Sequence, residues 1–86
     1  MKIKAGLCLR EVAGESVVVS VGADLDFDGM ITLNDTAAFL FRALSCEREE
    51  GELIRLLLDE YEVDEATARA AVQSFTAKLS EMDFLD

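Results

Sequence analysis

Three aspartates and a glycine stand close together in the segment DLDFDGMITLND, residues 24–35. Read as a calcium loop, the segment has Asp24, Asp26 and Asp28 at positions one, three and five, and their carboxylates are oxygen ligands that calcium prefers. The backbone carbonyl of Met30 would stand at position seven, and Asp35 would close the loop at position twelve. The spacing therefore allows a calcium site.

The surroundings of this segment favour a different interpretation. An EF-hand needs a helix on each side of its loop, and a dockerin-type module needs a second copy of the loop. Upstream, ESVVVSVG has a β pattern, and the later acidic stretch DEYEVDEATARA has Tyr61 and Val63 where oxygen ligands would be required. Because aspartate and glycine are also ordinary residues of loops between strands, we predict a connecting loop without a metal. A calcium-binding interaction module is the alternative.

Residues that could carry catalysis are scarce. The chain has no histidine, and none of its serines or cysteines has a recognisable base partner nearby in the sequence. Cys8 and Cys46 are too few for a zinc site or a disulfide framework, and we predict that both are buried and reduced. The sequence therefore predicts a protein that is not an enzyme and holds no cofactor.

Composition and charge narrow the class of protein further. The 86 residues are 51% hydrophobic and include no proline and no linker, which predicts one domain over residues 1–86. A formal net charge of −10 repels a phosphate backbone, so we expect no nucleic-acid partner. No apolar run reaches the roughly 20 residues of a membrane helix, and the first residues, MKIKAGLCLREV, lack a secretory signal. We expect a cytoplasmic protein that does not contact membranes.

The first part of the chain has the pattern of strands. Residues 7–12 alternate, with Leu7 and Leu9 on one side, and AGES then supplies turn residues. Residues 16–21 return as a second strand that places Val17, Val19 and Val21 on one face. The pattern of residues 30–33 predicts a third short strand, in which Ile31 and Leu33 face the core.

Helical spacing begins after Asn34 or Asp35, either of which can cap a helix that runs to about Ser45. A second helix follows the charged stretch CEREEGE and carries its apolar residues from Leu53 to Tyr61, and EREEGE is interpreted as its solvated beginning. Asp64 caps a third helix, whose predicted apolar stripe consists of Ala68, Val72, Phe75, Leu79 and Met82. The order predicts an α+β domain of winged helix-turn-helix type, with an N-terminal three-stranded antiparallel sheet followed by three helices.

Two stretches of this pattern resemble a known family. The strand-to-helix joint ITLNDTAAFLF and the helix EYEVDEATARAAVQSF resemble the motifs of the PqqD family, the peptide-binding proteins also called RiPP recognition elements. LREVAGESVVVSVG looks like the start of members that are encoded beside radical S-adenosylmethionine (radical SAM) maturases. The resemblance implies an adaptor that captures the leader of a precursor peptide and presents it to such an enzyme. An acidic winged-helix regulator that binds protein or DNA is a further alternative.

The candidate binding residues come from the third strand and the third helix. A short strand at a sheet edge can accept an added strand through its main chain. The main-chain groups that would hydrogen-bond to such a strand are those of Met30, Ile31, Thr32 and Leu33. Arg69, Val72, Gln73 and Thr76 would line the groove from the helix, with Arg69 facing an acidic group of the leader. The same open edge allows a monomer or a weak dimer.

The calcium alternative has a direct test. A ligand that binds only the folded state stabilises it by mass action, so a working loop would raise the melting temperature Tm in excess calcium. We expect melting curves in millimolar calcium and in chelator to overlap. A rise of several degrees that Asp26→Ala abolishes would establish the calcium module instead.

Overall fold

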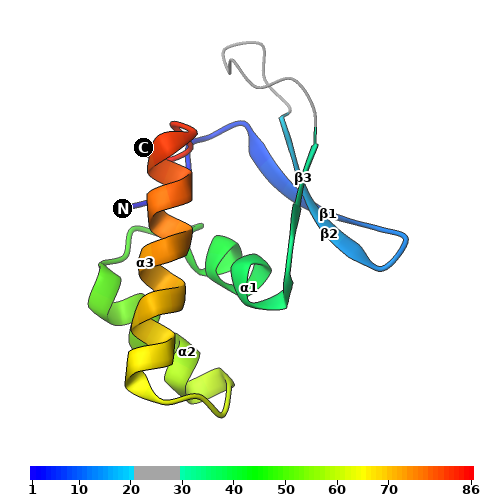
Figure 1. Cartoon of the computed structure of the whole chain (residues 1–86). Helices are drawn as coiled ribbons and strands as arrows, with labels where there is room; N and C mark the ends of the chain where they lie inside the picture. The colour runs from blue at the N-terminus through cyan, green and yellow to red at the C-terminus, as the bar shows by residue number, and fades with distance from the viewer. Residues whose placement is uncertain (21–29) are drawn as a thin grey trace.

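A sheet and three helices make up the computed structural model, which describes residues 1–20 and 30–86 (Figure 1). The sheet consists of β1 (Leu7–Val12), β2 (Glu15–Ser20) and β3 (Met30–Leu33), and the helices are α1 (Asp35–Ala43), α2 (Glu50–Glu60) and α3 (Glu65–Glu81). The strands are antiparallel and lie in the order β1-β2-β3. The predicted α+β fold of winged helix-turn-helix type, sheet first and helices after, is confirmed. The aspartates of the calcium alternative, Asp24, Asp26 and Asp28, lie outside the described residues.

A tight turn joins the first two strands. Ala13 and Gly14 both have positive φ, 53° and 83°, as a two-residue type I′ turn requires. Val12 on β1 therefore pairs directly with Glu15 on β2. This turn fixes the register of β1 on β2, and β3 pairs with the other edge of β2.

The face of the sheet toward the helices is apolar along one cross-strand row. Leu9 pairs with Val18, and Val18 pairs with Ile31, so one residue of each strand contributes to this row. Val18 is 1% exposed and belongs to the core, with Leu9, Ile31 and Leu33 packed against it. The inward direction of Ile31 and Leu33 is as predicted. Because side chains alternate along a strand, Val17 and Val19 share the opposite face, and Val21 lies outside the described residues.

Local hydrogen bonds begin each helix. The Asn34 side chain accepts from the Ala37 N–H at 2.8 Å at the start of α1, and Asp64 accepts from the Thr67 N–H at 2.7 Å at the start of α3. Hydrogen bonds from Thr67 lower the pKa of the Asp64 carboxyl, so this cap is lost when the pH falls through that lowered value. At α2 the Glu52 side chain accepts from the Glu49 N–H at 3.0 Å, so the helix begins before Leu53, within the acidic stretch.

The helix ends differ in part from the sequence prediction. α1 ends at Ala43 with Leu44 as its cap, two residues before Ser45. The stripe of α3 is buried as predicted at Ala68, Val72, Phe75 and Leu79. Met82 is the exception, because it follows the last helical residue and is 37% exposed, so its assignment to the core was wrong.

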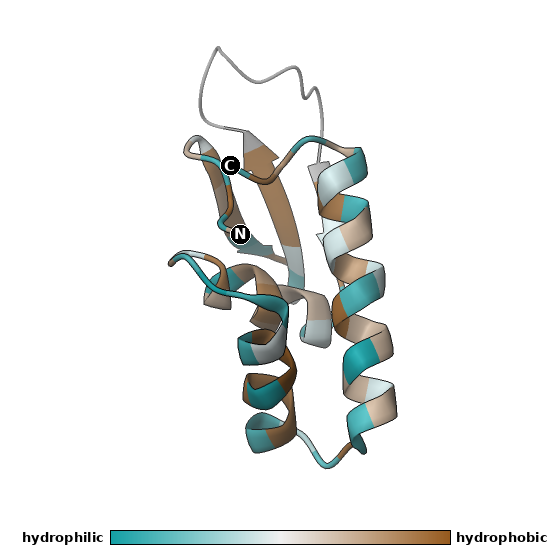
Figure 2. Ribbon diagram, turned by 90° about the vertical axis from the view of Figure 1, so that its left-hand side faces the viewer, coloured by the Kyte–Doolittle hydropathy of each residue, from teal (hydrophilic) through white to brown (hydrophobic). Residues whose placement is uncertain are grey.

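The core lies among the three helices and extends to one face of the sheet, which contacts α1. α2 and α3 pack side by side, and α3 shows alternating hydrophilic and hydrophobic bands in Figure 2, as an amphipathic helix does. Leu40, Leu44 and Leu53 are fully buried. The two ends of the chain also lie together, since Ile3 bridges to Leu85 and the Lys4 N–H donates to the Phe84 carbonyl at 2.8 Å.

The two cysteines differ in their surroundings. Both are free, as predicted, but Cys8 is half-buried and Cys46 is exposed. Their predicted burial was therefore wrong: Cys46 lies between α1 and α2, outside the apolar helix faces that form the core.

Within residues 1–20 and 30–86, no helix has the length and apolar character to cross a bilayer.

The buried face of α3 predicts a large effect of truncating Phe75, which is 7% exposed within the core. Phe75→Ala removes these contacts and leaves a cavity, so we expect a loss of about 3–5 kcal/mol in the free energy of unfolding. Gln73→Ala, on an exposed position of the same helix, is the matched control and should change this energy by less than about 0.5 kcal/mol. Urea titration followed by circular dichroism measures both variants, and equal stability would contradict the core assignment.

Candidate functional site

The direction of the backbone groups along β2 follows from the turn before it. The two residues that flank a two-residue hairpin turn exchange both of their hydrogen bonds, so the N–H and C=O of Glu15 point toward β1. The direction in which the backbone N–H and C=O groups point alternates from one residue to the next along an antiparallel strand. The backbone groups of Ser16 and Val18 consequently point the other way, toward β3.

The same alternation determines which groups of β3 are available. Ser16 pairs with Leu33 and Val18 pairs with Ile31, so Ile31 and Leu33 exchange their backbone hydrogen bonds with β2. The N–H and C=O groups of Met30 and Thr32 then point away from β2, toward the outer edge of the sheet. In the described part of the chain no further strand pairs there. β3 thus offers two donors and two acceptors, two residues apart, to an added strand.

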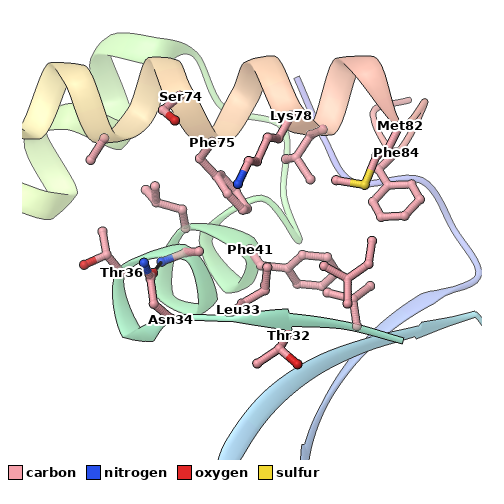
Figure 3. Close-up of a pocket in the computed structure, with 16 residues that line it drawn as sticks. Thr32, Leu33, Asn34, Thr36, Phe41, Ser74, Phe75, Lys78, Met82 and Phe84 are labelled. Carbon is pink, nitrogen blue, oxygen red and sulfur yellow. Dashed lines mark hydrogen bonds between the residues drawn. The ribbon is translucent and has the colours of Figure 1, made fainter. Parts of the chain in front are cut away.

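A cavity of about 340 Å³ lies beside this edge, between β3, α1 and α3 (Figure 3). Its walls include Ile31 and Leu33 from β3, Phe41 from α1, and Phe75 and Lys78 from α3. The apolar walls are parts of the same side chains that build the core. The cavity is therefore an opening at the surface of the core, and its position follows from the packing of both β3 and α3 against α1.

The two ends of the cavity differ in chemistry. Asn34 and Thr36, at the start of α1, lie at one end with Ser74, and Met82 and Phe84 lie at the other (Figure 3). The first end is polar and the second is apolar. A peptide lying along β3 would meet both.

The predicted residues of β3 and those of α3 have different places. Ile31, Thr32 and Leu33 line the cavity, whereas Val72 is 0% exposed and packed in the core. Arg69, Gln73 and Thr76 are not among the lining residues. Arg69 instead lies 3.7 Å from Glu65 in an exposed ion pair, and the Thr76 hydroxyl donates to the Gln73 carbonyl at 3.3 Å. Whether these residues of α3 contact a ligand stays a prediction.

Ala71, Ser74 and Lys78 are lining residues that the sequence prediction did not include. At 100° per residue they lie on one flank of the buried stripe of α3, while Arg69, Gln73 and Thr76 lie on the other flank. Helical periodicity identifies both flanks. It does not indicate which of the two faces β3, because that depends on how α3 packs.

Comparison with known proteins agrees with this fold. A solved structure described as "TbiB1 in Complex with the TbiA(beta) Leader Peptide" has the same fold, with a TM-score of 0.76 over 100% of this chain and 95% of that chain, at 19% sequence identity. The family model described as "Coenzyme PQQ synthesis protein D (PqqD)" matches residues 15–85. The chain therefore belongs to the PqqD family, as the sequence motifs indicated. No curated protein matches the chain.

The alternation along β3 is testable through backbone amides. We expect the amides of Met30 and Thr32, which point away from β2, to exchange hydrogen rapidly, and those of Ile31 and Leu33 to be protected. Proline substitution gives a matched pair, because Ile31→Pro removes a hydrogen bond to β2 and should lower the Tm more than Thr32→Pro. Uniform protection along β3, with equal effects of the two prolines, would contradict the assigned directions.

Proposed function

We propose that this protein is an adaptor that binds the leader segment of a ribosomally made precursor peptide and presents it to a modifying enzyme. The observation that carries the proposal is the outward row of backbone groups on β3 directly beside an apolar cavity. Membership of the PqqD family supports it, as does the fold shared with a protein whose structure holds a leader peptide. The adaptor itself performs no chemistry.

Binding would proceed by strand addition. The leader forms a fourth strand against β3, and its backbone exchanges hydrogen bonds with Met30 and Thr32. Side chains of an added strand alternate in direction, so every second one points toward the cavity. The ladder supplies affinity for any extended chain, and the cavity supplies selectivity among side chains.

The partner enzyme is proposed to be a radical SAM maturase. This part of the proposal rests on the resemblance of LREVAGESVVVSVG to family members that are encoded beside such enzymes. An adaptor of this kind leaves the reactive segment of the precursor free, because it holds only the leader.

The test is a titration with the leader of a precursor peptide encoded next to this protein's gene. We expect saturable binding by isothermal calorimetry, with backbone amide shifts concentrated on β3 and on the cavity side of α3. Thr32→Pro should weaken binding by at least about 10-fold, because it removes an outward donor, while the protein remains folded. Binding that Thr32→Pro leaves unchanged would exclude the β3 edge as the site.

Glu11→Pro provides a control on the other edge of the sheet. Glu11 is an exposed residue of β1 that pairs with Ser16, and its N–H points away from β2, so its substitution removes an outward donor on β1 rather than on β3. We expect this variant to bind the leader like the parent protein wherever it remains folded by circular dichroism. Loss of binding in both variants at intact fold would point to a general effect of proline on the sheet.

A further inference from the structure

Lys78 is the one charged residue among the described residues that line the cavity. Its side chain projects from α3 into the cavity, and its amine lies beside Phe75, as Figure 3 shows. Within residues 1–20 and 30–86 it takes part in no ion pair, although the chain carries 18 Asp and Glu against 8 Lys and Arg. Among the described residues, no carboxylate pairs directly with this positive charge at the cavity.

The surroundings of Lys78 are apolar on one side. Phe75 precedes it by three residues and Met82 follows it by four, so both lie on the same side of the helix. Phe84 adds a further apolar wall at the Met82 end of the cavity. Lys78 therefore stands between Phe75 and an apolar compartment formed by Met82 and Phe84.

The spacing of a strand matches this arrangement. Residues two apart on a strand point to the same face and are about 7 Å apart. A peptide paired with β3 therefore presents neighbouring cavity-facing side chains to Lys78 and to the apolar compartment in succession. Charge complementarity favours a carboxylate for the side chain that faces Lys78, and burial favours an apolar group for the side chain that faces the apolar compartment.

We propose that the segment bound at β3 carries an acidic residue that pairs with Lys78, and an apolar residue two positions away that enters the compartment of Met82 and Phe84. This inference rests on the proposed function and deepens it, because it states the side-chain chemistry of the leader. Lys78 is the residue that sets this specificity.

The net charge of the protein makes the acidic preference informative. A surface with a formal charge of −10 disfavours acidic peptides in general. Selection of an acidic residue at one position therefore requires a local attraction that exceeds the overall repulsion. Lys78 supplies such an attraction within the cavity.

A displayed library of random 12-residue peptides tests the inference with the full chain. We expect peptides selected by the parent protein to contain Asp or Glu two positions from a Leu, Ile, Met or aromatic residue. Lys78→Glu should weaken the best of these peptides by at least about 10-fold, and exchanging the peptide's acidic residue for lysine should restore binding to that variant. Arg55→Glu, at an exposed position of α2, is the matched control: it makes the same charge change away from the cavity and should leave affinity within about 2-fold.

The outcomes separate this inference from the proposed function. Selected peptides that require Thr32 but show no acidic preference, or bind Lys78→Glu as tightly as the parent, would overturn the role of Lys78 and retain the β3 site. A larger effect of Arg69→Glu than of Lys78→Glu would also overturn it, and would place recognition on the opposite flank. A library that yields no peptide sensitive to Thr32→Pro would overturn the β3 site, and the inference with it.

Discussion

The site depends on which residues of each strand point their backbone N–H and C=O groups toward which edge of the sheet. The positive φ of Ala13 and Gly14 produces a two-residue turn, which sets the direction of every backbone group on β2. Through β2 it decides that Thr32, rather than Ile31, points to the open edge. A one-residue change of register would reverse both this direction and the side of the sheet that Ile31 and Leu33 occupy.

Stability and recognition use the same elements in different ways. The inward side chains of β3 and α3 join the core, which fixes the distance between strand and helix. The outward backbone of β3 and the polar side chains at the cavity contribute little to that core. The arrangement therefore separates the outer backbone edge of β3, which is the proposed binding site, from the side chains that build the core.

Charge acts at two ranges in this molecule. The overall acidity repels polyanions at long range, whereas a single lysine beside an apolar compartment acts over a few ångströms. No described residues bring three metal-ligating side chains of the His, Cys, Asp or Glu types together. Backbone hydrogen bonding, apolar contact and one local charge are thus the interactions that the site offers to a ligand.

The sequence by itself determined the elements and the family, because alternation, helical spacing and caps such as Asn34 and Asp64 are local signals. Local patterns gave the bounds of β1 and β3 but misplaced Met82 and Cys46, whose exposure depends on where the chain leaves the core. Only the tertiary structure decided which flank of α3 faces β3. That choice brought Lys78 rather than Arg69 to the cavity, since it follows from packing between segments far apart in the sequence.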